Sequence, residues 1–194
     1  MGDNLGASLL HWKEQTRKKL SQAEFEAQSR QFRGRAAVLM SIFDRQGEHN
    51  FLLTRRTQEV ATHKGQICFP GGLEEEVDRS LWETALRETE EEIGVPPKEV
   101  EYLGSFKDYT SVTGYSVTPF AGYLKEGFTT VSNPREVASM LEVPFRFFHE
   151  TMPLVQRRWR HDRWIKVYFY HYGGQIIWGL TARMIKDFLD YIEK

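Results

Sequence analysis

The chain of 194 residues is 40% hydrophobic and 27% charged, a composition ordinary for one globular domain with an extension. Its formal net charge of −1 provides no overall field that would draw it to nucleic acid or to a membrane. No apolar run is long enough to span a bilayer, and the first residues lack the charged-then-apolar pattern of a secretion signal. We therefore expect neither nucleic acid nor membrane as a partner.

Cysteine usage bears on the compartment. Cys68 is the single cysteine, so no disulfide can form within the chain. This fits a reducing environment, and we expect a cytoplasmic protein. Cys68 lies in the short apolar run 66–69, which favours a core position for it.

The N-terminal part mixes a helical segment with a strand pair. Residues 8–32 form an amphipathic pattern of one or two helices, which is either a cap packed on the domain or a partner-binding arm. Residues 36–43 have the pattern of a buried strand, and residues 51–54 follow a polar turn as its return strand.

Residues 55–68 carry potential cations ahead of a glycine turn: Arg55, Arg56, His63 and Lys64. They belong either to an ordinary polar loop or, if a metal site lies beside them, to a phosphate-binding site. Gly65 marks a bend, and residues 66–69 read as a short strand that Pro70 ends.

Residues 80–93 are predicted to form a helix. Ser80 is a good N-cap, and Glu83 three residues later completes a capping-box pattern. Gly94 ends the helix, and the prolines that follow prevent its resumption.

The predicted helix has two distinct sides. At 100° per residue, a core-facing stripe contains Trp82, Leu86, Thr89 and Ile93. A second side gathers the carboxylates of Glu88, Glu91 and Glu92. These carboxylates are either a solvated acidic face or ligands for a hard cation such as Mg²⁺. The glycine turn just upstream favours the metal.

Two further strands are predicted after the helix, at residues 100–107 and 115–124. Pro119 within the second suggests an edge position or a bulge. Residues 125–134 form a long polar loop of the kind that often lines a site.

The C-terminal part is predicted to hold a short helix from Pro144, a hairpin and a last helix. Residues 165–170 alternate as a strand, a Gly-Gly turn follows, and residues 175–178 return. Thr181 is the expected cap of the last helix, whose packing side holds Ile185, Leu189 and Ile192.

The hairpin segment is strongly basic and contains Arg157, Arg158, Arg160, Arg163 and Lys166, together with Trp159 and Trp164. It is either a charged hairpin that keeps the protein in solution, or a patch for an anionic part of a ligand or for a partner subunit. A homodimer is therefore kept as an alternative. Strands that alternate irregularly with three or four helices indicate an α/β protein, with a mixed sheet covered on both faces.

Residues 85–95, ALRETEEEIGV, resemble the second half of the Nudix box, G-x5-E-x7-R-E-U-x-E-E-x-G-U with U apolar. The matching residues are Arg87-Glu88, Glu91-Glu92 and Gly94-Val95. Thr89 departs from the pattern, since an aliphatic residue is usual there. The spacing from Gly72 to Arg87 is one residue longer than usual. The position of the first glutamate of the box therefore falls on Asp78 when it is counted forward from Gly72, and on Arg79 when it is counted back from Arg87.

The longer spacing resembles the coenzyme A diphosphatase branch of the Nudix hydrolases. That branch carries the upstream signature L-L-T-x-R-[ST]-x3-R-x3-G-x3-F-P-G-G, which matches here at Leu52, Leu53, Thr54, Arg56, Thr57, Gly65, Phe69, Pro70, Gly71 and Gly72. Ala61 stands in place of the second arginine. If that arginine binds the substrate, another cation, such as Arg55, His63 or Lys64, must do so here. The stretches YSVTPF (115–120), PREVA (134–138) and IWGLTAR (177–183) also resemble the branch.

The resemblance implies a Nudix-type α/β/α sandwich around a mixed β-sheet at residues 35–194, with residues 1–34 as an N-terminal helical extension. It implies Mg²⁺- or Mn²⁺-dependent attack of water on a diphosphate. For this branch the substrate is coenzyme A or its thioesters, and the products are 3′,5′-ADP and 4′-phosphopantetheine or its acylated form.

Glu88 and Glu92, one turn apart, are the expected metal ligands, with Glu91 as a third ligand or directly behind them. The Gly72 carbonyl is expected to face the metal, and Arg87 to orient the carboxylates. The general base is either a box glutamate or Glu136. The expected substrate-binding residues are Arg55, Arg56, Thr57, His63, Lys64, Gly65, Gly71 and Gly72.

Two other functions stay open. One is a Nudix enzyme for another substrate, such as ADP-ribose or an oxidised nucleotide, which the upstream signature disfavours and Ala61 favours. The other is a non-catalytic Nudix-fold binding module, which the complete set of box glutamates disfavours.

Overall fold

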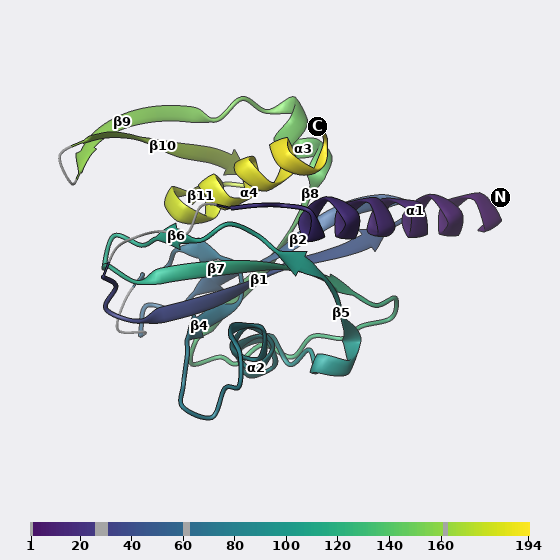
Figure 1. Ribbon diagram of the computed structural model, residues 1–194, viewed down its shortest axis with the longest axis horizontal. Helices are drawn as coiled ribbons and strands as arrows, with labels where there is room; N and C mark the ends of the chain where they lie inside the picture. The colour runs from purple at the N-terminus through teal and green to yellow at the C-terminus, as the bar shows by residue number, and fades with distance from the viewer. Residues whose placement is uncertain (1, 26–30, 60–62, 161–162) are drawn as a thin grey trace.

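A computed structural model describes residues 2–25, 31–59, 63–160 and 163–194 (Figure 1). Eight of the described strands form one sheet: β1 (Arg35–Arg45), β2 (Glu48–Arg56), β3 (Ile67–Cys68), β4 (Gly71–Leu73), β5 (Val100–Ser105), β6 (Tyr109–Thr110), β7 (Ser116–Leu124) and β8 (Val137–Pro144). A smaller sheet holds β9 (Leu154–Arg160), β10 (Arg163–Tyr172) and β11 (Gln175–Trp178). The helices are α1 (Gly2–Ser21), α2 (Leu81–Ile93), α3 (Phe145–Glu150) and α4 (Gly179–Ile192), with a 3₁₀ turn at Pro97–Glu99.

The main sheet is mixed, as predicted. Its order is β3-β2-β1-β7-β5, with β4 paired to β1, β6 to β7 and β8 to β2. Strand β1 is antiparallel to β2 and parallel to β7. The parallel pair is possible because the connection between β1 and β7 is long and includes α2.

Helices cover both faces of this sheet (Figure 1). Along β1, Leu39 and Phe43 join the apolar cluster under α2, whereas Met40 and Ile42 join the cluster shared with α4. This alternation follows from the two-residue period of a strand. The predicted α/β/α sandwich is therefore confirmed.

Helix α1 packs on the domain, as the first of the two interpretations of this segment expected. Leu20 is buried in the same cluster as α4, and Lys13 pairs with Glu101 of β5 at 2.7 Å. Trp12 lies 4.1 Å from the ring of His49, centroid to centroid. The helix predicted within residues 8–32 ends at Ser21. Residues 26–30 of the predicted stretch lie outside the described residues.

Most predicted strands are confirmed, but the edge position suggested by Pro119 is wrong. β7 is an inner strand between β1 and β5. The Pro119 carbonyl accepts a hydrogen bond from the Phe106 N–H at 2.8 Å, so the polar groups of this residue point away from β1. On this side of β7, the pairing with β5 ends at Phe120 and the pairing with β6 begins at Val117. Pro119 lies between the two, so its missing N–H faces the interval between two partner strands.

The predicted cap of the last helix is also wrong. α4 begins at Gly179, with Trp178 as its N-cap residue. The Thr181 hydroxyl instead donates a hydrogen bond to the Ile67 carbonyl of β3 at 3.2 Å. The expected packing residues Ile185, Leu189 and Ile192 are buried. Among the described helices, none has both the length and the apolar character needed to cross a membrane.

Candidate functional site

Helix α2 begins and ends where the local signals predict. The Ser80 hydroxyl accepts a hydrogen bond from the Glu83 N–H at 3.3 Å, which satisfies one free donor of the first turn. The Glu83 carboxylate turns to the Arg79 N–H at 3.0 Å, so the reciprocal half of the capping box is replaced. Gly94 has φ 70° and closes the helix in the left-handed conformation.

The carboxylate side of α2 is not a uniformly solvated face. Glu91 is exposed, whereas the Glu88 side chain is 15% exposed and the Glu92 side chain 2%. The predicted core stripe is confirmed at Thr89 and Ile93, which are buried. A carboxylate buried as deeply as Glu92 needs a cationic or hydrogen-bonding partner.

Arg87 gathers the acidic groups around the glycine turn. Its Nε and Nη2 atoms donate to the two oxygens of Asp78 at 3.0 Å each. Its Nη1 atom lies 2.9 Å from Glu88 Oε1 and 3.3 Å from Glu91 Oε2. Nη2 also donates to the Leu73 carbonyl at 3.0 Å. The expectation that Arg87 orients carboxylates agrees with this geometry.

Asp78 is the acidic residue that the longer spacing left undecided. It also accepts hydrogen bonds from Thr84 Oγ1 and from the Glu75 N–H, both at 2.9 Å. The hydrogen bonds from Arg87 hold the pKa of Asp78 at about 2, below its ordinary value of 3.8. Of the two alignments of the box, the one counted forward from Gly72 therefore identifies the acidic residue that contacts Arg87.

Glu92 lies at the centre of the site. Its Oε1 atom is 3.3 Å from Arg56 Nη1, and its buried Oε2 atom has no hydrogen-bond partner among the described residues. The pKa of Glu92 is raised to about 8: burial is the largest cause, Arg56 acts against it, and the charges of Glu88 and Glu136 add to it. Burial likewise raises the pKa of Glu88. A nearby cation would stabilise the charged form of these buried carboxylates.

The glycine pair 71–72 brings backbone close to these carboxylates. A Cβ atom on Gly72 would lie 2.3 Å from Glu88 Oε1, so any side chain here would displace that carboxylate. A Cβ atom on Gly71 would lie 2.3 Å from the Ala37 carbonyl oxygen, and Gly71 has φ 154°. Gly72 therefore serves the site, whereas Gly71 serves the packing of β4 on β1.

The polar loop after β7 reaches the same place. The Asn133 N–H donates to the Glu92 carbonyl at 2.9 Å, and Asn133 Nδ2 donates to Glu136 Oε1 at 3.1 Å. The Thr57 N–H donates to the Glu136 carbonyl at 2.9 Å. These contacts tie Glu136 to the end of β2 and to α2, in agreement with the expectation that this loop lines a site.

The predicted substrate-binding residues divide into two groups. Arg56 pairs with Glu92, and Thr57 Oγ1 donates to the Arg135 carbonyl at 2.8 Å. Within the described residues, no hydrogen bond or ion pair joins Arg55, His63 or Lys64 to a carboxylate. These residues lie at the end of β2 and in the exposed loop before β3, where Gly65 makes its bend with φ 66°. Ala61 falls outside the described residues.

The donor set fits a divalent ion that is only partly held by protein. In the described part of the chain, no three His, Cys, Asp or Glu side chains form a ready metal cluster, because the box glutamates face Arg56 and Arg87. Glu88 and Glu92 nevertheless bring two carboxylates and one unpartnered buried oxygen to the glycine turn. Mg²⁺ is usually bound by one or two carboxylates, with waters and substrate phosphates completing the shell.

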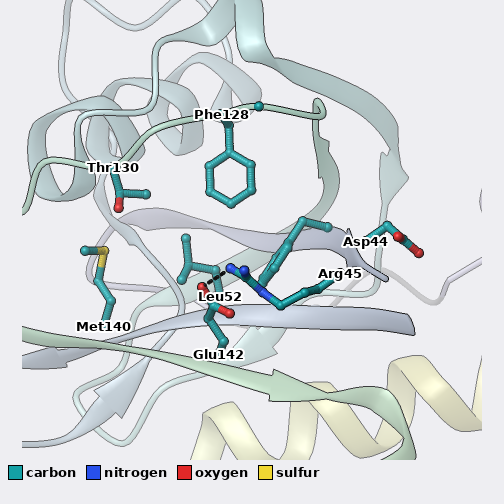
Figure 2. Close-up of a pocket in the computed structure, with 9 residues that line it drawn as sticks. Asp44, Arg45, Leu52, Phe128, Thr130, Met140 and Glu142 are labelled. Carbon is teal, nitrogen blue, oxygen red and sulfur yellow. Dashed lines mark hydrogen bonds and ion pairs between the residues drawn. The ribbon is translucent and has the colours of Figure 1, made fainter. Parts of the chain in front are cut away.

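A hollow of about 530 Å³ lies on the same side of the sheet as α2 (Figure 2). Its apolar lining includes Phe43, Leu52 and Phe128. Arg45 Nη2 and Glu142 Oε1 meet at 2.6 Å at its edge. Because this ion pair neutralises the arginine, the hollow suits an uncharged group better than a phosphate.

Comparison with known proteins identifies the family. A model of the NUDIX domain matches residues 33–175. The chain belongs to the Nudix family. Nudix hydrolases are pyrophosphatases that act on phosphorus-containing anhydrides of nucleoside diphosphate derivatives, and they generally depend on a divalent metal.

Relatives and solved structures agree with the Nudix assignment. A protein of Photorhabdus laumondii named as an uncharacterized Nudix hydrolase, NudL, is 41% identical over 165 residues, covering 81% of this chain and 84% of that one. A NudL of Yersinia enterocolitica is 41% identical over 155 residues, with 78% and 77% covered.

Two solved structures share the fold. A MutT/nudix family protein from Enterococcus faecalis has a TM-score of 0.52 at 15% identity, covering 97% of this chain and 70% of that one. A protein of Deinococcus radiodurans has a TM-score of 0.52 at 10% identity, with 84% and 89% covered. At such identities the likeness concerns the fold alone.

Proposed function

We propose that this Nudix hydrolase is a coenzyme A diphosphatase, which cleaves coenzyme A and its thioesters to 3′,5′-ADP and 4′-phosphopantetheine or its acylated form. The observation that carries the proposal is the junction of two motifs. Arg56 of the upstream signature pairs with Glu92 of the box, and Gly72, which ends the signature, leaves room for Glu88.

The reaction requires water to attack one phosphorus of the diphosphate while the bond from that phosphorus to the bridging oxygen breaks. Two phosphate monoesters form, and since each has a second pKa of about 6, together they release close to two protons at neutral pH. In our proposal Glu88 and Glu92 hold Mg²⁺ or Mn²⁺, with Glu91 and the Gly72 carbonyl beside them. The ion, when bound, neutralises the diphosphate and activates water.

The other residues of the site position charge. Arg87 holds the Glu88 and Glu91 carboxylates in place through its own anchor on Asp78. Arg56 belongs to the upstream signature and contacts Glu92. If a metal ion binds Glu92 in its place, the Arg56 guanidinium is free to bind a phosphate oxygen. Glu136 is our candidate to take the proton from water, because its carboxylate is held by Asn133, whose N–H also bonds the Glu92 carbonyl.

A turnover screen tests the substrate. Purified protein with Mg²⁺ or Mn²⁺ is given coenzyme A, acyl-coenzyme A, ADP-ribose and an oxidised nucleotide, and the products are identified by mass. We expect 3′,5′-ADP to appear from coenzyme A. Hydrolysis of ADP-ribose without hydrolysis of coenzyme A would overturn the proposal in favour of the second candidate. A homodimer is a separate expectation, which the molar mass in solution tests.

Glu92→Gln tests the metal role. Glutamine keeps the size of the side chain but loses the charge, so we expect kcat to fall by roughly a hundredfold or more. The melting temperature should hold or rise, because burial raises the pKa of Glu92 to about 8 and the neutral amide avoids the cost of a buried charge. Glu90→Gln is the matched control, because Glu90 is exposed on the same helix. Equal activity of the two variants would remove Glu92 from the ligand set.

A further inference from the structure

A second hollow, of about 390 Å³, lies between β10 and α4 and is lined by Trp164, Ile165, Lys166, Tyr168 and Arg183. Alternate residues of a strand share one face. Tyr170, on the same face as Tyr168 and Lys166, is buried in the core at the base of the hairpin. The face that carries Lys166 is therefore turned toward the body of the molecule, where α4 contributes Arg183.

Strand β9 extends this face. Trp159 pairs with Trp164 across the two strands, with ring centroids 5.4 Å apart, and Arg157 pairs with Lys166. Directly opposed residues of an antiparallel pair lie on the same face. Trp159 and Trp164 are 57% and 64% exposed. Large aromatic rings exposed beside cations form a surface on which a nucleotide base can stack.

The groove is cationic. In the described part of the chain, Lys166 has no ion-pair partner. Arg183 and Lys107 share the single carboxylate of Asp187, at 3.0 and 2.9 Å, which leaves one positive charge in excess. The hollow of Figure 2 differs in this respect, because Glu142 neutralises its arginine.

The groove is also connected to the candidate site. Arg183 and Thr181 belong to the stretch IWGLTAR, and Thr181 is bonded to Ile67 of β3. The next residue of β3, Cys68, lies against Thr54 of β2, two positions before Arg56. In Figure 1 the β9–β10 hairpin extends beyond the end of the main sheet where β6 lies. The groove is therefore linked through β3 to the strand that carries Arg56.

We propose that the groove formed by Trp164, Lys166, Tyr168 and Arg183 binds a nucleoside that carries a phosphate monoester in addition to the scissile diphosphate. The aromatic side chains stack on the base, and Lys166 with Arg157 meets the phosphate monoester. The inference rests on the proposed function, in which the substrate end with this chemistry is the 3′-phosphorylated adenosine of coenzyme A.

The test compares substrates with and without that phosphate. Lys166→Ala and Arg157→Ala should each raise KM for coenzyme A about tenfold, because a charge-assisted contact is lost. KM for dephospho-coenzyme A should change less than twofold. Arg158→Ala is the matched control, since its side chain lies on the opposite face of β9 from Arg157 and bonds Gln156 there. If Arg158→Ala and Lys166→Ala have equal effects, the groove is not the binding site.

A binding measurement separates this inference from the proposed function. Tryptophan fluorescence of the wild-type protein is titrated with adenosine 3′,5′-bisphosphate and with AMP. Tighter binding of the bisphosphate that Lys166→Ala removes supports the groove, even if coenzyme A is not hydrolysed. Hydrolysis of coenzyme A together with bisphosphate binding that Lys166→Ala leaves unchanged would overturn the groove and retain the function.

Discussion

Asp78, whose side chain is 4% exposed, anchors Arg87 by accepting two parallel hydrogen bonds from its guanidinium group. Asp78→Asn keeps the shape but loses the charge. We expect a loss of about 1–2 kcal/mol in the free energy of unfolding at neutral pH, after allowance for solvent screening. Urea denaturation measures it, and an unchanged midpoint would contradict the role of this pair.

The same residue predicts a pH dependence. The pKa of Asp78 is lowered in the folded protein, from 3.8 to about 2. Its contribution to stability is therefore complete above the ordinary pKa and is lost as pH falls through the folded one. Between pH 4 and pH 2, the wild-type protein should lose more stability than Asp78→Asn does. Parallel acid titrations of the two proteins by circular dichroism make the comparison.

Alanine substitutions at Gly72 and Gly71 should have different effects on activity and on stability. Gly72→Ala would place a methyl group against the Glu88 carboxylate, which is the mobile end of a long side chain. We expect the melting temperature to change little and activity to fall about a hundredfold, since a displacement near 1 Å is enough for such a loss. In Gly71→Ala the clash is with backbone, so the melting temperature should fall. The reverse pattern would contradict this assignment of roles.

Among the elements, α1 shows how a polar helix is held. Leu20 is buried, and a Cβ atom on Gly104 would lie 2.5 Å from the Leu20 Cβ atom. Leu20→Ala should lower the free energy of unfolding by about 2–5 kcal/mol. Leu10→Ala, at a position 52% exposed, should change it by less than about 0.5 kcal/mol.

Equal stability of the two leucine variants would mean that α1 does not stabilise the domain. The division of the chain at residue 34 into an extension and a Nudix domain stays a prediction. Helix α1 lies outside the residues 33–175 that the family model matches.

Elements with complete local signals were predicted well. Ser80 and Gly94 lie at the ends of α2 because capping depends on a few neighbouring residues. The edge position predicted from Pro119 and the cap role predicted for Thr181 were wrong because segments distant in the sequence determine the surroundings of both residues. The first depends on where β5 and β6 meet β7, and the second on the free carbonyl of Ile67.

For the whole molecule, the sequence motifs identified the site but not its internal contacts. The box glutamates, Arg56 and the glycine pair are all found from spacing. The Arg56–Glu92 pair joins residues 36 positions apart, and the groove beside β10 depends on which face of a hairpin meets α4. Neither follows from periodicity, because both arise from tertiary packing.

The layout of the sheet also has a consequence for the order of folding. β1, near the start of the domain, is an inner strand only after β7 has joined it, and Glu136 reaches Thr57 only after the chain has continued to the start of β8. Contacts between such distant segments form late, because closing long loops costs entropy before the contacts form. A chain emerging from the ribosome would therefore hold its box helix early and its complete site only after β8 has been synthesised.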